Sequence, residues 1–345
     1  MRSISSALQS AQESTSSTPY VWIFLTSADG GTQYNYSDRL IQLEHTEEPY
    51  NDSATIILYD NDGGIGDLLG YWLQIGYGYN CTPYGGGAQE YSETPRLWVK
   101  AQHTISREGD LFMVLFCEGM WTALQELDLI TKGEPPAFRG VYEDISVYDI
   151  IEDILASVEF GDDAFSLEAL ATDDGIMDTF KPKLWLNESP FEPPAEVLYR
   201  LIAMTKSYLR AKPDLAFEVI YPQEADSADE IYYSNKPYYF YEYREITNTN
   251  VPNKIVVYAN AGQDEEWSSI ITAESEDAVS IAQYHTVTAH HIAADIDNQT
   301  DADNRASAIM SKIRGETLAG RLIIPHDCRV ELYDKVAVYD ARKEA

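Results

Sequence analysis

One short run of the sequence places a base, an acid and a nucleophile next to each other. His326, Asp327 and Cys328 supply an imidazole, a carboxylate and a thiol, which are groups that a cysteine nucleophile site uses. Catalytic nucleophiles and their bases normally come from distant positions and meet only in the folded chain. We therefore interpret these three residues as a turn between two strands.

A glycine-rich loop carries Asp60, Asp62 and Asp67, whose carboxylates are the oxygen ligands that calcium prefers. The spacing does not fit an EF-hand loop, because its twelfth position is Tyr71 and not glutamate. An Asp/Asn/Gly turn between two strands explains the same residues, and we favour the turn.

The histidines form no metal-binding pattern. His290 and His291 are adjacent, and a strand places adjacent side chains on opposite faces. We expect surface or packing roles for all six, the others being His45, His103, His285 and His326.

Motifs of known chemistry are also missing from the sequence. There is no GxSxG, Walker, dinucleotide-binding or HExxH motif. A pair of carboxylates suited to glycoside hydrolysis means little among 57 acidic residues. The sequence predicts no catalytic, cofactor-binding or metal-binding residue, and a protein that is not an enzyme.

The segment from Tyr232 to Tyr243 is unusually rich in tyrosine. Exposed aromatic rings bind protein partners or sugars, whereas a half-buried aromatic strand has the same composition. We weigh a protein interface and a core strand equally, and a sugar site below both.

The charge limits the class of partner. The 345 residues carry a net charge of −33, and no basic cluster stands out. Nucleic-acid binders need clustered Lys and Arg to neutralise phosphates, so stable binding of nucleic acid is not expected. A membrane-spanning segment is excluded as well, because no window approaches the roughly 20 apolar residues that it needs.

The cysteines and the N-terminal segment indicate a reducing environment. Three widely spaced cysteines are no disulfide framework, and residues 1–17 lack the apolar stretch of a signal peptide. We expect synthesis in the cytoplasm. The cysteines are Cys81, Cys117 and Cys328.

Short apolar runs separated by Gly, Asn, Asp and Pro fill the first third, after one short helix expected at Ile4–Gln12. This pattern is typical of a barrel or sandwich. The expected strands are Tyr20–Thr26, Leu40–Glu44, Ala54–Tyr59, Tyr71–Tyr77, Arg96–Gln102 and Leu111–Cys117.

The apolar spacing then becomes helical. Asp144–Val158 has a helical stripe with Ser146 as its expected N-cap, and a second helix follows Pro193 and Pro194. Strands at Ala216–Tyr221 and Tyr238–Tyr243 complete a mixed α/β region.

The last third is predicted to be mostly β structure. Its one helix, Thr300–Arg314, has Thr300 as the expected cap. The expected strands are Lys254–Ala259, Glu266–Thr272, Gln283–Ile292, Arg321–Ile324, Arg329–Leu332 and Lys335–Asp340.

Several of these segments, in this order, resemble the hub proteins of bacteriophage tails. The resemblance is to the baseplate hub and late control protein D group, which is related to the spike of type VI secretion systems. It is spread over about 300 residues. The segments that carry it are Asp38–Ile41, Ala54–Asp60, Leu73–Gly78, Val251–Val257, Asp301–Asp303, Ile324–Asp327 and Leu332–Val336.

The resemblance implies a mainly β fold, in which two tube-like β-barrel domains flank a mixed α/β domain. It also implies a homotrimer whose six barrels form a ring at the tail tip or baseplate of a virion. Its partners would be the tail tube, distal tail and tape measure proteins and the central spike. Genomic DNA would pass through the ring transiently, and three copies with a charge of −33 each would repel it from an acidic wall.

The expected domains are an N-terminal segment at 1–18, a first barrel at 19–138, the mixed domain at 139–245 and a second barrel at 246–345. The alternative hypothesis is a carbohydrate-binding or glycan-degrading β-protein of a virion, which would use Tyr and Trp platforms with a carboxylate pair.

Overall fold

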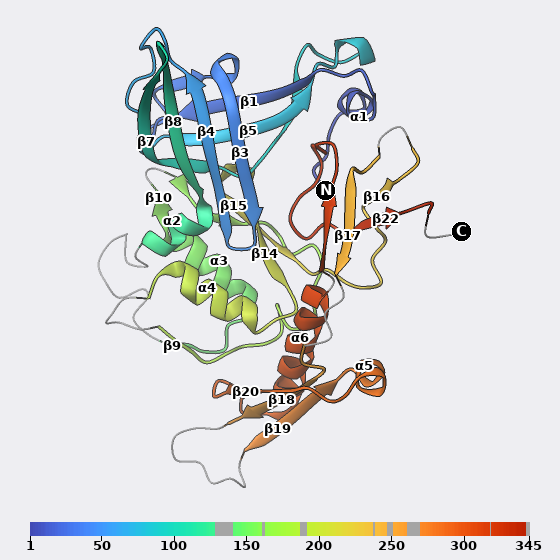
Figure 1. The fold of residues 1–345 in the computed structure, drawn as a ribbon. Helices are drawn as coiled ribbons and strands as arrows, with labels where there is room; N and C mark the ends of the chain where they lie inside the picture. Colours follow the sequence, from blue (N-terminus) through green and yellow to red (C-terminus); the bar gives the residue numbers. More distant parts are fainter. Residues whose placement is uncertain are drawn as a thin grey trace.

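The computed structural model describes residues 1–127, 141–160, 163–186, 192–236, 239–246, 251–260, 270–317 and 319–342. A large antiparallel sheet from the N-terminal third lies against a helical layer, and a small sheet of the last third lies at the opposite end of the molecule (Figure 1). α1 (Ser6–Gln12) starts where the Ser5 hydroxyl accepts a hydrogen bond from the Leu8 N–H. None of the described helices has the length and apolar character needed to cross a membrane.

The N-terminal sheet contains eight antiparallel strands. Their order is β2-β1-β5-β7-β8-β4-β3, and β6 pairs with β5. All six strands expected in this region are confirmed, several with longer bounds. The strands are β1 (Pro19–Thr26), β2 (Gln33–Asn35), β3 (Leu40–Glu48), β4 (Asn51–Tyr59), β5 (Trp72–Tyr79), β6 (Glu90–Glu93), β7 (Leu97–Arg107) and β8 (Asp110–Gly119).

Alternate side chains of these strands form a core inside the sheet. Ile23 and Leu25 of β1 pack in it with Ile56 and Leu58 of β4, and β1 and β5 cross over β3 and β4 in Figure 1. The sheet therefore folds back on itself around one apolar cluster. Its end strands β2 and β3 do not pair among the described residues, so the expected closed barrel is corrected to an open, folded sheet. One reason is that β2 is only three residues long.

Two glycines of β5 allow β6 to lie close to it. A Cβ atom on Gly78 would come within 1.8 Å of the Glu90 carbonyl oxygen, and one on Gly76 would come within 2.6 Å of the Tyr91 ring. Any side chain at Gly78 therefore collides with backbone. The close pairing of β5 and β6 depends on this Gly-Tyr-Gly stretch.

The middle region forms the helical layer and three small sheets, β10-β11, β12-β15-β14 and β13-β9. The hydroxyl of Ser146 caps α3 as expected, by accepting a hydrogen bond from the Asp149 N–H. The apolar faces of α3 and α4 pack in the largest core of the molecule. The elements are α2 (Met120–Glu126), β9 (Val141–Tyr142), α3 (Val147–Ser157), β10 (Glu159–Phe160), β11 (Asp163–Ala164), β12 (Ser166–Leu167), β13 (Leu184–Trp185), α4 (Pro194–Ala203), β14 (Tyr208–Lys212) and β15 (Ala216–Ile220).

The last third forms three small sheets, so the expected second barrel is not found in the described residues. β16 pairs with β22, β17 pairs with β21, and β18 lies between β19 and β20 with α6 packed against this last sheet. The elements are β16 (Glu230–Tyr233), β17 (Glu242–Ile246), β18 (Lys254–Ala259), β19 (Ile271–Glu276), α5 (Ala278–Gln283), β20 (Thr288–Ala293), α6 (Gln299–Thr317), β21 (Ala319–Ile323) and β22 (Val336–Tyr339).

Three local predictions in this region were wrong. Asn298 and not Thr300 caps α6, because its side-chain oxygen accepts the Asp301 N–H at 2.9 Å. Residues 278–283 are helical, since Asp277 caps them, so only the second half of the strand expected at 283–292 exists. Residues 329–332 lie in a turn region and not in a strand. The expected strand at 266–272 lies largely outside the described residues.

Candidate functional site: an ionic junction between distant segments

Charged side chains from four distant parts of the chain meet beside the turn that joins β3 to β4. They come from the N-terminal segment, from β3, from the adjacent strands β14 and β15, and from the turn at 331–334. We call this group the ionic junction. It consists of the Met1 amino group, Arg2, Glu47, Arg210, Lys212, Glu218, Glu331 and Asp334.

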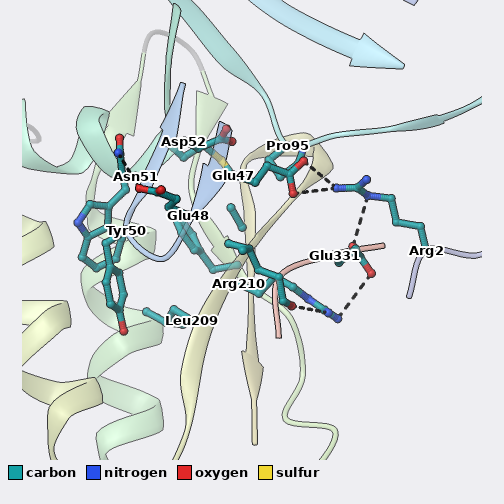
Figure 2. A pocket seen from close by; sticks show the side chains of 15 residues that line it. Arg2, Glu47, Glu48, Tyr50, Asn51, Asp52, Pro95, Leu209, Arg210 and Glu331 are labelled. Atoms are coloured by element: carbon teal, nitrogen blue, oxygen red, sulfur yellow. Dashed lines mark hydrogen bonds and ion pairs between the residues drawn. The ribbon is translucent and has the colours of Figure 1, made fainter. Parts of the chain in front are cut away.

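Arg2 connects the N-terminal segment to β3 and to the turn at 331–334. Its Nη2 donates to the two carboxylate oxygens of Glu47 at 3.1 and 3.3 Å. Its Nε lies 3.6 Å from the Glu331 carboxylate. Figure 2 shows Glu331 between the side chains of Arg2 and Arg210, with dashed lines to both. Glu331 therefore joins two arginines from distant parts of the sequence, the N-terminal segment and β14.

Arg210 of β14 contacts three carboxylates of the junction. Its Nη1 donates to Asp334 at 3.1 Å and to the Leu332 carbonyl oxygen at 3.2 Å, and its Nη2 donates to Glu218 at 2.9 Å. Only 4% of the Glu331 and Asp334 side chains is exposed. Buried carboxylates need such partners to stay charged.

The same contacts lower the pKa of Glu218. Burial by itself raises the pKa of this carboxyl, but the hydrogen bond from Arg210 and the charges of Arg210 and Lys212 outweigh it. The pKa is therefore lowered below its ordinary value. The ion pair is favourable in the folded chain, and its contribution to stability depends on pH.

A cavity of about 40 Å³ lies within the junction, lined by Arg2, Arg210 and Glu331 among others. This volume accommodates one water molecule but no substrate. The junction therefore lacks the space that a catalytic site requires, and its geometry fits a clamp between segments.

Beside the junction, a hydroxyl, an imidazole and a carboxylate form a chain. Nδ1 of His45 lies 3.0 Å from the Tyr77 hydroxyl, and Nε2 lies 3.0 Å from Asp52. Burial, followed by the nearby charge of Glu47, raises the pKa of Tyr77, so the phenol is not activated as a nucleophile. The chain connects β3, β4 and β5 in the interior. Sequence reasoning missed it, because His45 and Asp52 lie just outside the strands expected at Leu40–Glu44 and Ala54–Tyr59 and become part of β3 and β4 in the structure.

The expected turn at His326–Cys328 is another buried contact point. The Asp327 carboxylate accepts hydrogen bonds from Gln12 at 2.8 Å, from the Tyr232 hydroxyl at 2.9 Å and from Arg329 at 2.8 Å. Burial raises the pKa of the Cys328 thiol to about 12. All three groups are thus used in packing or hydrogen bonding, and they are not arranged as a nucleophile and base.

The other candidates also have structural partners. Asp62 forms two 2.7 Å hydrogen bonds with Arg39, and Asp60 accepts the Ile65 N–H at 2.9 Å. Asp67 accepts the Leu69 N–H at 3.0 Å. Among the described residues, no three His, Cys, Asp or Glu side chains are grouped to hold a metal ion.

The histidine and tyrosine candidates are divided between the interior and the surface. His290 is exposed and stacks on Tyr258, whereas burial lowers the pKa of the neighbouring His291. Tyr232 is 2% exposed, whereas Tyr241 is 64% exposed. The tyrosine-rich segment therefore contributes both a core residue and exposed rings.

Solved structures show what fold this arrangement belongs to. No protein-family model matches the sequence, and no curated protein matches it significantly. A tail protein from Neisseria meningitidis MC58 is similar with a TM-score of 0.62 at 12% identity, covering 94% of this chain and 88% of that chain. The 43 kDa tail protein of prophage MuSo2 from Shewanella oneidensis gives 0.61 at 12% identity, covering 94% and 90%.

A third structure is the prophage tail protein gp18 from Listeria monocytogenes EGD-e. It has a TM-score of 0.53 at 11% identity, and the alignment covers 83% of this chain and 76% of that chain. Over most of its length, the chain therefore has the fold of phage tail proteins.

Proposed function

We propose that the chain is a structural hub of a phage tail tip or baseplate, and not an enzyme. The observation that supports this most is the likeness to a tail protein over 94% of the chain. The ionic junction agrees with a mechanical role, because it joins four parts of the chain that are far apart in sequence. The proposal would be contradicted if the chain does not associate with other tail proteins.

In this proposal three copies form a ring that adapts the tail tube to the central spike and leaves a channel for DNA. The domain proposed at 19–138 would pair its edge strands with neighbouring copies, since the strand order of the N-terminal sheet is open at β2 and β3, and residues 246–345 are proposed as the other outer domain. The boundary at 138–139 lies outside the described residues, and the one at 245–246 falls within β17.

The charge supports a channel that does not retain DNA. Each copy carries −33, and acidic walls repel phosphates instead of binding them. Tail tube, distal tail, tape measure and spike proteins are the proposed partners.

The native mass of the purified chain over a concentration series tests the ring. A species of about 117 kDa, three times the chain mass of 38.9 kDa, supports a trimer, and electron microscopy then shows whether it has a central hole. A chain that stays monomeric both alone and with its spike protein contradicts the proposal. A closed particle without a channel contradicts the DNA-passage part alone.

A further inference from the structure

An open cavity lies on the other side of the β3–β4 turn from the ionic junction. Its volume is about 460 Å³, and three aromatic side chains line it, Tyr50 from the turn, Trp121 from α2 and Tyr199 from α4. Figure 2 shows the Tyr50 side chain pointing away from Arg2 and Glu331. We call this cavity the aromatic pocket. Nothing in the proposed hub function accounts for it.

The rings stand as walls and not as one flat platform. The Tyr50 and Trp121 centroids are 4.6 Å apart at an interplanar angle of 51°, and the Tyr50 and Tyr199 centroids are 5.4 Å apart at 82°. Trp121 is only 8% exposed and its ring packs against Tyr50, so the accessible rings are those of Tyr50 and Tyr199. A cation is attracted to the face of such a ring. The ring geometry thus favours a cation.

The backbone at this position is strained. Tyr50 has a φ of 61°, and a bulky residue adopts this left-handed region at an energetic cost. Tyr50 is the second residue of the two-residue turn between β3 and β4, and several tight turns place that residue at positive φ. The turn therefore accounts for the strain and presents the Tyr50 ring to the pocket.

The charges of the pocket favour the same ligand. Glu192 is buried and paired with Arg200 at 2.9 Å. Glu196 also lines the pocket and is exposed, and its carboxylate has no ion pair or hydrogen bond to other described residues. One carboxylate therefore remains for a cation from outside. The net charge of −33 additionally attracts basic partners to the whole molecule.

We propose that the aromatic pocket binds a lysine or arginine side chain of a partner protein. The cation would lie against the rings of Tyr50 and Tyr199, with Trp121 packed behind Tyr50, and form an ion pair with Glu196. The occupant is a protein side chain because the site lies on the surface, holds one compact cation and shows no features of a buried cofactor site. The proposal does not depend on the trimeric ring.

The test uses the full chain and the peptide acetyl-Gly-Lys-Gly-amide at millimolar concentrations, with binding followed by the NMR signal of the Trp121 indole N–H. The same peptide with norleucine in place of lysine is the uncharged control. We expect the lysine peptide to shift the Trp121 signal and the norleucine peptide to leave it unchanged. Equal binding of both peptides, or no shift with either, overturns the proposal.

Two variants locate the site. Glu196→Gln and Tyr199→Ala are each expected to weaken binding of the lysine peptide about fivefold. The matched controls, Glu152→Gln on the exposed face of α3 and Tyr241→Ala at an exposed tyrosine, should not change it. If all four variants bind alike, the attraction is only that of the net charge, and the proposal fails. Displacement of the peptide by a neutral oligosaccharide would indicate a sugar site and would also overturn it.

Discussion

Replacing Arg210 by methionine should destabilise the protein strongly. Methionine keeps much of the side-chain volume but removes the guanidinium group that contacts Glu218, Asp334 and the Leu332 carbonyl. Two of the carboxylates around it, Glu331 and Asp334, have side chains only 4% exposed. They would stay buried with fewer positive neighbours.

Loss of one partner from a buried ion pair costs about 3–5 kcal/mol. Lys212 and the Met1 amino group remain near the same carboxylates, so we place the effect at about 3 kcal/mol, the lower end of that range. Arg244→Met is the matched control, because Arg244 pairs with Glu242 at the surface and is 66% exposed. Exposed pairs contribute at most about 1 kcal/mol.

Urea unfolding at pH 7, followed by tryptophan fluorescence, measures both variants. The double variant Arg210→Met with Glu218→Gln should recover part of the loss, since it removes one of the unpaired charges. If the free energy of unfolding of Arg210→Met lies within about 1 kcal/mol of that of the unchanged chain, the junction does not hold the segments together and the reasoning is refuted.

Three further results are expected. Acid should destabilise the fold, because the pKa values of Glu218 and Asp327 are lowered, mainly by arginine hydrogen bonds that outweigh the effect of burial. The contribution of these two carboxylates to stability is complete above their unfolded pKa values of 4.5 and 3.8, and it is lost as the pH falls below those values. Urea unfolding midpoints that stay constant from neutral pH to pH 3 would contradict this prediction. Gly78→Ala should lower the free energy of unfolding by about 1–3 kcal/mol, because its Cβ collides with Glu90. Gly66→Ala is the control and should not lower it, since a Cβ there has nothing within 4 Å. Equal melting temperatures of the two variants would argue against the close pairing of β5 and β6. The three cysteines are buried and should react with a thiol reagent only after unfolding, and rapid labelling of the native chain would show that a thiol is accessible.

Much of the N-terminal sheet was predictable because its signals are local. The short apolar run Ala54–Tyr59 predicts a strand, and its residues Ile56 and Leu58 lie in the core. This signal lies within a few residues. The N-cap at Ser146 is equally local. The strand expected at Arg329–Leu332 failed, because the Asp334 carboxylate accepts the Glu331 N–H at 2.7 Å and stabilises a turn there instead.

The ionic junction was not predictable from the sequence. Its contacts join residues such as Arg210 and Asp334, which are 124 positions apart, and each charged residue is ordinary in its own segment. The aromatic pocket was missed for the same reason, since Tyr50, Trp121 and Tyr199 come from three separate elements. Such sites depend on tertiary packing, which local patterns do not contain.

The long range of the junction also has a consequence for the order in which the protein is made. A ribosome synthesises Arg2 and Glu47 long before Glu331, the other carboxylate partner of Arg2. The N-terminal sheet is complete once residue 119 has emerged, so it can fold while synthesis continues. Arg2 and Glu331 can meet only after the whole span between them has been synthesised. Closing the junction therefore follows the synthesis of the N-terminal sheet and of the middle region.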